Sequence, residues 1–536
     1  MKTYSREQFV KDVTAGIIVA IIALPLSIAL ALASGVGPEA GIFTAIVAGF
    51  VISALGGSSV QIAGPTAAFA TIVAGIVAKN GLDGLVIATI LAGIFLILMG
   101  LCHFGTLIRF IPYTITTGFT AGIAVTIVIG QLKDFFGVTY PDGVKPIETM
   151  EKLHAFVENC GTVNPSAVIV GVVSLAILII SPYIFKKIPG SLLAVVAGIL
   201  MVKFLPLKAS TIGDLYSISN ALPGFHLPAL SLAAVEDAIP NAFTIAVLAA
   251  IESLLSCVVA DGMINGKHRS DMELVAQGAG NIASALFGGI PATGAIARTA
   301  ANIKNGGRTP IAGMVHSITL VLVLVVLMPY AGMIPMPTIA AILFVVAYNM
   351  CQWRPFTHLI QTAPKSDILV LLVTFFLTVV FDLVVAIEIG MLLTCLLFMK
   401  RMSDETHVDS WTYVDDDSDA VNDHMQKLAK EIRVYEITGP LFFGAANAIE
   451  HIVVKDFTKC LVLRMRSVPA LDSTAMNALQ NLVKYCEAKG ITPIFSHVNE
   501  QPMHVMEKAG FVELVGKDNF CANISDALKR AEELIK

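Results

Sequence analysis

Two segments decide the fold that this sequence predicts: GGSSVQIAGPTAAFATIVAGIVA at residues 56–78 and GGIPATGAIARTAANI at residues 288–303. Each opens with glycines and a proline that favour extended chain, and each continues as an apolar run of only half-helix length. Interrupted spans at corresponding positions of two halves indicate a transporter built from inverted repeats, with a site between them near the midplane of the membrane. The alternative is a pair of membrane kinks that bind no ligand.

The composition separates the chain into two parts of different chemistry. Of the 536 residues, 56% are hydrophobic and only 14% are charged, which is too few charges to cover the surface of a soluble protein of this size. Residues 402–536 nevertheless carry 21 of the 40 Asp and Glu residues and 14 of the 35 Lys and Arg residues. We therefore expect a large membrane domain followed by an acidic soluble domain. This composition excludes a soluble enzyme for most of the chain.

The sequence lacks basic patches and metal-ligand motifs. Neither part has the clustered Lys and Arg residues that binding to a nucleic-acid backbone requires, so we expect no nucleic-acid partner. The eight cysteines are scattered, without a CxxC motif or a His at ligand spacing. We interpret them as packing residues and predict no metal site, no disulfide framework and no cofactor.

Apolar runs bounded by turn and charge signals predict an all-α polytopic membrane protein with fourteen spans, seven in each half. The first seven are expected at residues 13–33, 39–56, 62–78, 84–102, 111–130, 166–185 and 189–206. The second seven are expected at residues 240–260, 272–288, 291–303, 310–330, 332–350, 367–382 and 384–399. The predicted domains are a membrane domain at 1–401 with repeats at about 9–207 and 235–401, a linker at 402–424 and a soluble domain at 425–536.

The distribution of basic residues predicts the orientation of the membrane domain. An even number of spans puts both termini on one side of the membrane. Fourteen Lys and Arg residues fall in tails and loops on that side, and six fall on the opposite side. Because cytoplasmic loops are enriched in Lys and Arg, we predict that both termini are cytoplasmic.

The acidic tail has the pattern of an α/β domain. Short apolar runs predict strands at 431–438, 460–466 and 492–498, and helical spacing predicts helices at 474–488 and 501–509. Alternating strands and helices are typical of a compact α/β domain. A last amphipathic helix is expected to dock through Ile524, Leu528, Ala531 and Ile535. The run from Asp415 to Asp419 is interpreted as a solvated linker.

The two half-helix starts predict an anion site. A helix N-terminus presents unbonded N–H groups and roughly half a positive charge, so two facing starts attract an anion. Arg298 adds a full charge where a central Arg costs at least about 2.5 kcal/mol on insertion scales, and we expect it to face a cavity or a partner. The alternative is a structural ion pair with Glu252 or Glu388. Thr66 and Thr293 offer hydroxyl donors at the two starts, or act only as caps.

Glu252 is the candidate for ion coupling. It lies within the apolar run 246–260, and Ser256 follows one turn later on the same face of the helix. A carboxyl group within the membrane is a functional candidate, and desolvation favours its protonated form. Glu252 is therefore expected to take up and release a proton during a transport cycle. The alternative is a neutral, hydrogen-bonded structural Glu.

Several stretches resemble the SulP anion permeases, whose animal relatives include pendrin and prestin. The resemblance rests on ALP at residues 23–25, PEAGIFTA at 38–45, QIAGPTAAF at 61–69 and IPATGAIARTAAN at 290–302. The tail resembles the STAS domain of that family. This resemblance covers nearly the whole chain and implies two inverted seven-span repeats, a core domain that carries the substrate, a gate domain, and a homodimer held partly by the STAS tails.

The resemblance also implies that the anion lies between the third and tenth half-helices. The implied contacts are Thr66, Ala67 and Phe69 from the third span, Ile296, Ala297 and Arg298 from the tenth, and Leu26 from the first. Some relatives have a hydroxyl side chain in place of Ala297, so backbone amides are expected to contribute more of the binding here.

The resemblance bears on the coupling ion as well. Sodium-coupled bicarbonate members have Asp and Thr where this chain has Glu252 and Ser256. This difference favours a proton over sodium, although both side chains still offer oxygens to a cation.

A possible regulatory residue is Ser473 in the tail. The stretch LDSTA at residues 471–475 resembles the loop that is phosphorylated on Ser in the anti-sigma-factor antagonists that share the STAS fold. A phosphate there would meet the N-terminal dipole of a helix. The alternative, which we favour, is that Asp472 and Ser473 cap a helix that begins at Thr474.

Together these features predict a secondary active anion transporter of the plasma membrane, and not an enzyme. We expect sulfate uptake by proton symport through an elevator-like movement of the core against the gate, in a homodimer embedded in the lipid bilayer. A bicarbonate or C4-dicarboxylate transporter, sodium-coupled or exchanging, is the nearest alternative, because amide dipoles and one Arg select the sign of a charge better than the identity of an anion. An anion channel and a membrane-tethered STAS sensor are alternatives from other classes.

Overall fold

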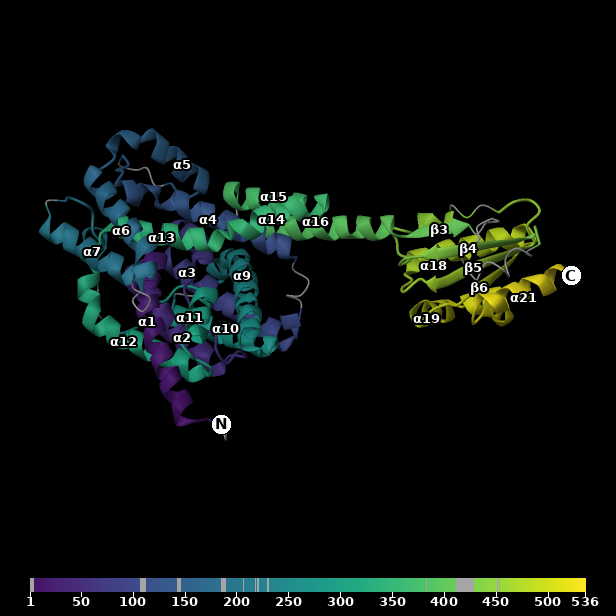
Figure 1. The fold of residues 1–536 in the computed structure, drawn as a ribbon, viewed down its shortest axis with the longest axis horizontal. Helices are drawn as coiled ribbons and strands as arrows, with labels where there is room; N and C mark the ends of the chain where they lie inside the picture. The colour runs from purple at the N-terminus through teal and green to yellow at the C-terminus, as the bar shows by residue number, and fades with distance from the viewer. Residues whose placement is uncertain are drawn as a thin grey trace. The chain divides into compact units, whose positions relative to one another are not determined.

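The computed structural model describes residues 4–106, 112–141, 146–184, 189–205, 207–216, 218, 221–228, 231–381, 383–410, 429–450, 452 and 454–536. The chain divides into two compact units, Met1–Met391 and Leu392–Lys536. The first unit is helical, and the second contains a five-stranded sheet (Figure 1). The boundary falls within α16 (Leu383–Asp404), earlier than the predicted end of the membrane domain at residue 401.

The first unit is built mainly from apolar helices. Its helices are α1 (Arg6–Ala33), α2 (Pro38–Leu55), η1 (Ala67–Phe69), α3 (Ala70–Leu101), α4 (Tyr113–Phe136), α5 (Thr149–Glu158), η3 (Cys160–Thr162), α6 (Pro165–Ile184), α7 (Gly190–Phe204), α8 (Ile212–Leu215), α9 (Leu232–Ile264), α10 (Ser270–Leu286), α11 (Ile296–Lys304), α12 (Pro310–Ala331), α13 (Met336–Cys351), α14 (Trp353–Thr362) and α15 (Lys365–Val380). In the described part of the chain, eight helical segments are long and apolar enough to cross a membrane. The helical fold class is confirmed, and the number of fourteen spans stays a prediction.

The predicted break between the third and fourth spans is present within α3. α3 consists of two helical parts that meet at Gly81, where φ is 73° and ψ is −172°. These angles are not helical, and a positive φ is favourable for Gly. The helix boundaries differ from the predicted spans in a pair of short helices, α5 and α14, which lie outside those spans. They are too short and too polar to be found by a search for long apolar runs.

Helices α3 and α10 approach each other closely through glycines. A Cβ on Gly93 of α3 would lie 2.6 Å from the carbonyl oxygen of Gly278 in α10, and a Cβ on Gly100 would lie 2.6 Å from the carbonyl oxygen of Asp271. Between membrane helices, association depends on such close packing because lipid is as apolar as the side chains. The small residues therefore set the spacing of two helices that flank the candidate site.

The second unit contains a mixed sheet with the strand order β3-β4-β5-β6-β7. Its strands are β3 (His407–Ser410), β4 (Ile432–Thr438), β5 (Cys460–Ser467), β6 (Thr492–Ser496) and β7 (Phe520–Cys521). β3 is antiparallel to β4, and the other neighbours are parallel. The three predicted strands are confirmed, whereas β3 and β7 are too short to show a periodic pattern.

The start of the predicted linker at 402–424 needs correction. Residues up to Asp404 complete α16, and His407–Ser410 form β3, whose backbone pairs with β4. Residues 402–404 and 407–410 therefore belong to a helix and a strand and not to a linker. The rest of the predicted linker, including the acidic run at 415–419, lies outside the described residues, as do residues 111, 185, 206 and 382 at the ends of predicted spans.

Helices cover both faces of this sheet. One face packs against α18 (Ser473–Ala488), α19 (Glu500–Lys508) and α20 (Phe511–Val515), and the other packs against α21 (Ile524–Ile535). The short elements α17 (Asn447–Glu450) and η5 (Lys517–Asn519) complete the unit. Leu528 and Ala531 are buried in the hydrophobic cluster that α21 forms with the sheet, and Ile524 and Ile535 pack against this cluster. The predicted docking of the C-terminal amphipathic helix is therefore confirmed.

We predict that Gly278→Leu destabilises the first unit by about 1 to 3 kcal/mol, because the added side chain forces α3 and α10 apart. A thermal-stability assay of the detergent-solubilised protein measures the effect. The control is Gly262→Leu on α9, where nothing lies within 4 Å of an added Cβ. An unchanged melting midpoint for Gly278→Leu would contradict the role assigned to this glycine contact.

Candidate anion site at two half-helix starts

The two interrupted segments meet through a short antiparallel pairing. β1 (Ala63–Gly64) pairs with β2 (Thr293–Gly294), with Ala63 opposite Gly294 and Gly64 opposite Thr293. The N–H of Ala295 extends this pairing by donating to the carbonyl oxygen of Ile62 at 2.9 Å. η1 and α3 follow β1, and α11 follows β2. The pairing therefore brings two helix starts together within the first unit, as the interrupted segments predict.

Neither helix start is capped by a side chain. The N-cap residues are Thr66 for η1 and Ala295 for α11, and neither side chain accepts a hydrogen bond from its helix. The first N–H groups of a helix have no partner within the helix, so backbone donors remain at both starts. Ala297, in the first turn of α11, is exposed, and Thr66 is half-buried. Two helix starts with uncapped amides and exposed positions form a site suited to an anion.

The other predicted contacts surround these starts. Ala67 and Phe69 of η1 are buried, Ile296 at the start of α11 is half-buried, and Leu26 is half-buried on α1. α1 packs against α11, so Leu26 belongs to a helix next to the tenth segment. The structure thus places the predicted residues of the first, third and tenth segments on neighbouring elements.

Arg298 lies behind the helix starts and is 2% exposed. Its Nη2 donates to the carbonyl oxygen of Pro65, across the β1 segment. Its Nη1 lies against Gly64, where an added Cβ would have to displace the guanidinium. The Nε and Nη1 atoms have no hydrogen-bond partner among the described residues. Arg298 therefore keeps its positive charge within a buried region beside both helix starts.

The alternative role of Arg298 as a structural ion pair is not supported. Within the described ranges, the ion pairs do not include Arg298, Glu252 or Glu388. A carbonyl group shares a hydrogen bond with Arg298 but does not neutralise it. The charge is thus available to raise the electrostatic potential at the helix starts.

Glu252 of α9 contacts the third segment directly. Its Oε2 accepts a hydrogen bond of 2.9 Å from the Thr66 hydroxyl. The Thr66 hydroxyl is therefore engaged with Glu252, and it makes no hydrogen bond that caps η1. The predicted coupling residue and the predicted anion contact are joined by one hydrogen bond.

The hydroxyls of Thr293 and Ser256 connect α9 to the tenth segment. Thr293 Oγ1 lies 2.7 Å from Ser253 Oγ, and Ser256 Oγ donates to Thr299 Oγ1 at 3.4 Å. Thr293 and Ser256 are both buried. Their side chains fasten β2 and α11 to α9, so the Thr293 hydroxyl is engaged with a helix and does not cap α11.

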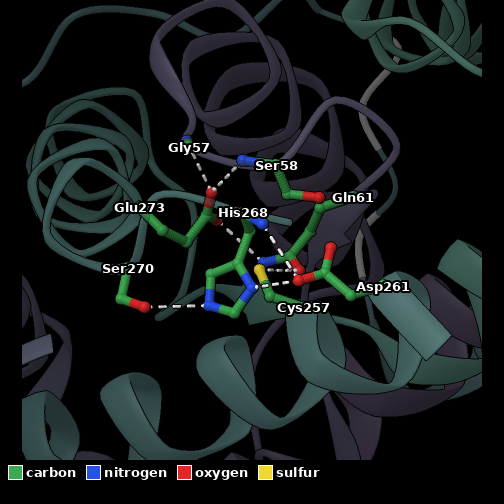
Figure 2. A network of polar contacts seen from close by, with 8 residues as sticks. All are labelled: Gly57, Ser58, Gln61, Cys257, Asp261, His268, Ser270 and Glu273. Atoms are coloured by element: carbon green, nitrogen blue, oxygen red, sulfur yellow. Dashed lines mark hydrogen bonds and ion pairs between the residues drawn. The ribbon is translucent and has the colours of Figure 1, made fainter. Parts of the chain in front are cut away.

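A polar network on α10 holds the entry to β1, and the sequence analysis did not identify it (Figure 2). Glu273 is fully buried, and its carboxylate accepts from the N–H groups of Gly57 and Ser58 at 2.8 and 3.1 Å and from Gln61 Nε2 at 2.8 Å. Gln61 Oε1 accepts in turn from Cys257 of α9. Loop 56–61 is therefore fixed to both α9 and α10.

A matching contact holds the loop before β2. Asn281 of α10 exchanges two hydrogen bonds with the backbone of Ala292, at 2.8 and 2.9 Å. Glu273, Gln277 and Asn281 recur every four residues, so they form a polar stripe on an otherwise apolar helix. That spacing was the signal in the sequence from which this network could have been found.

The turn between α9 and α10 carries a smaller polar cluster (Figure 2). Asp261 Oδ2 lies 2.7 Å from His268 Nδ1 and accepts from the His268 N–H at 2.9 Å. Ser270 Oγ lies 3.0 Å from His268 Nε2. These contacts close the turn and thereby fix the start of α10, from which Glu273 projects.

In the second unit, Asp472 is the N-cap of α18. Its Oδ1 accepts from the N–H of Ala475 at 2.8 Å, and its Oδ2 accepts from the N–H of Phe443 at 2.8 Å. Ser473 is the first residue of the helix and is exposed. The capping interpretation therefore holds for Asp472, and the regulatory role of Ser473 stays a prediction.

The chain is similar to known membrane transporters over most of its length. A family model described as the sulfate permease family matches residues 9–374, and a STAS domain model matches residues 426–527. The chain is 39% identical over 532 residues to "Putative sulfate transporter YvdB" of Bacillus subtilis, with 97% of each chain covered. It is 31% identical to the bicarbonate transporter BicA of Picosynechococcus, over 97% of this chain and 94% of BicA.

Solved structures with the same fold extend this similarity. Murine Slc26a9, described as an anion transporter in the inward-facing state, matches with a TM-score of 0.89 at 18% identity, over 99% of this chain and 93% of that chain. This match concerns the fold alone. The transmembrane domain of a cyanobacterial BicA matches with a TM-score of 0.64 at 31% identity, over 72% of this chain and 98% of that chain.

We predict that Glu273→Ala destabilises the folded protein by roughly 3 kcal/mol or more, because it leaves several buried donors without an acceptor. Thermal unfolding of the purified full chain in detergent measures the loss. Glu7→Ala is the control, since Glu7 is exposed and its ion pair with Lys11 lies on the surface. If both variants melt at the wild-type temperature, the network does not hold the site.

Proposed function

The chain belongs to the sulfate permease family, and we propose that it is a secondary active anion transporter whose anion binds at the two half-helix starts. The observation that supports this proposal most strongly is the antiparallel pairing of β1 and β2. This pairing places the starts of η1 and α11 side by side, with the buried charge of Arg298 behind them.

In the proposed site, backbone amides and one side-chain charge attract the anion. Each helix start contributes roughly 0.3 to 2 kcal/mol toward a negative charge. Ala297 offers no hydroxyl, so the N–H groups of the first turns of η1 and α11 would act as donors. Arg298 would add long-range attraction without contacting the anion. Such a site is selective for negative charge and only weakly selective among anions of similar size.

The hydrogen bond between Glu252 and Thr66 suggests how transport is coupled to protons. An ionised Glu252 would repel an anion held at the start of η1, whereas a protonated Glu252 would not. Proton binding and anion binding would therefore favour each other by the same factor, as linkage requires. This reasoning supports proton symport, with Glu252 as the proton carrier. Sodium held by Glu252 and Ser256 oxygens is the alternative.

Sulfate is the first candidate, and bicarbonate is the second because BicA is similar over nearly the full chain. Transport would proceed by an elevator-like movement of the core against the gate, in a homodimer of the plasma membrane with both termini in the cytoplasm. The STAS unit would stabilise the dimer, and phosphorylation of the exposed Ser473 would be one means of regulating it.

We predict that Arg298→Ala lowers anion affinity about tenfold or more, because the long-range attraction of a buried charge beside the helix starts is lost. Uptake of radiolabelled sulfate, bicarbonate and succinate into proteoliposomes, with proton and sodium gradients imposed in turn, measures affinity and identifies the coupled ion. Lys304→Ala, at the exposed C-terminal end of the same helix, is the control. Wild-type affinity in Arg298→Ala would remove Arg298 from the site.

The same assay separates the other classes of function. Accumulation of an anion against its gradient is expected of a transporter, whereas a channel dissipates the gradient. A STAS sensor with a vestigial membrane domain would bind a ligand and show no flux. Either of these results for the wild-type protein would overturn the proposal.

We predict that Glu252→Gln lowers proton-driven accumulation, because the proton carried by Glu252 is lost, while anion counterflow without a proton gradient continues. The amide oxygen still accepts the Thr66 hydrogen bond, but the amide cannot carry a proton. Parallel measurements of driven uptake and counterflow reveal the difference. Glu236→Gln, an exposed residue near the start of the same helix, is the control. Unaltered dependence on the proton gradient in Glu252→Gln would place the coupling elsewhere.

A further inference from the structure

His316 is a buried titratable residue that the proposed transport cycle does not yet use. It lies two turns into α12, and its side chain is 0% exposed. Neither ring nitrogen has a hydrogen-bond partner among the described residues. An unpartnered polar side chain in a membrane interior is costly, and a group retained at such a cost is a candidate for function.

The imidazole and the Arg298 guanidinium both lie near residues 63–64. His316 Nδ1 lies 3.9 Å from the position of a Cβ on Gly49, and the carbonyl oxygen of Ala63 lies 3.3 Å from that position. The next residue of β1, Gly64, lies against Arg298 Nη1. A positive charge acts over several ångströms in a low-dielectric interior. His316 is therefore close enough to respond to the charge state of the anion site.

The other charged groups on the packed elements lie at the helix ends. The helices packed against α12 are α1 and α2. α1 carries Arg6, Glu7, Lys11 and Asp12 within its first two turns, and α2 carries Glu39 in its first turn. Asp12 accepts from Thr309 at the start of α12, roughly 10 Å along the helix from His316. On α11, Lys304 lies at the far end from Arg298.

We propose that His316 is a second proton carrier of the transport cycle, which takes up a proton when the anion binds at the half-helix starts. This inference rests on the proposed anion transport. Without an anion, the field of Arg298 opposes a second positive charge, and the ring is neutral. A bound anion offsets that field, so a proton from the aqueous side adds to a ring nitrogen and forms the imidazolium. The proton returns to water when the anion leaves on the other side.

The consequence is a stoichiometry of two protons for each anion, one carried by Glu252 and one by His316. A divalent anion such as sulfate would then cross without net movement of charge. Loss of the proton that His316 carries would reduce the stoichiometry to one proton per anion. Sulfate transport would then move net charge across the membrane. A purely structural His316 would change stability or rate but not this ratio.

The test measures proton and sulfate fluxes together in proteoliposomes that contain the full chain. Radiolabelled sulfate gives the anion flux, a trapped pH dye gives the proton flux, and a potassium–valinomycin clamp sets the voltage. We expect two protons per sulfate and no voltage dependence for the wild type. For His316→Asn and His316→Gln we expect one proton per sulfate and voltage-dependent uptake, with sulfate counterflow retained. His358→Asn, an exposed residue on α14, is the control.

A second measurement keeps the inference testable if both variants fail to fold. Adding sulfate to weakly buffered wild-type protein in detergent should cause uptake of more than one proton per bound anion. An uptake of one proton or fewer, or an unchanged flux ratio in a folded His316 variant, would overturn the inference while leaving Glu252 as the sole carrier. Absence of wild-type uptake of sulfate, bicarbonate and succinate alike would contradict the proposed function itself, and this inference with it.

Discussion

The structure of the membrane unit depends on the two-residue pairing between β1 and β2. Two short helices that begin inside a membrane leave N–H groups without partners, which is costly unless the chains before them are held in place. The pairing provides this constraint, and the Arg298 bond to Pro65 ties the third segment to the tenth. The other contacts described at the candidate site hold the segments around this pairing.

Helices α9 and α10 hold the short pairing of β1 and β2 in place. α9 contacts both segments through Glu252 and Ser253, and α10 holds both preceding loops through Glu273 and Asn281. Glycines let α10 pack closely against α3. Because so few backbone bonds join β1 and β2, we infer that the rigidity needed to orient two helix dipoles comes from these side chains. Buried polar groups therefore serve the site as well as the fold.

The sequence was sufficient to predict which segments meet, because Gly and Pro interrupt two apolar runs at matching places. It also predicted the strands and the docked C-terminal helix of the second unit, where periodicity is strong. It did not predict that Thr293 bonds α9 or that Arg298 bonds a carbonyl group, because such partners depend on tertiary geometry. The predicted break between the third and fourth spans is present at Gly81, where φ is positive. His316 was overlooked because a single His in an apolar run carries no periodic signal.

The central claim is that an anion binds between the starts of η1 and α11. The most direct measurement is an experimental structure of the full chain with selenate, a sulfate analogue that can be located by anomalous scattering. The account predicts selenate within about 3 Å of backbone nitrogens in the first turns of both helices, near Ala67 and Ala297. Selenate bound away from both starts, under conditions in which it competes with sulfate for uptake, would contradict the account.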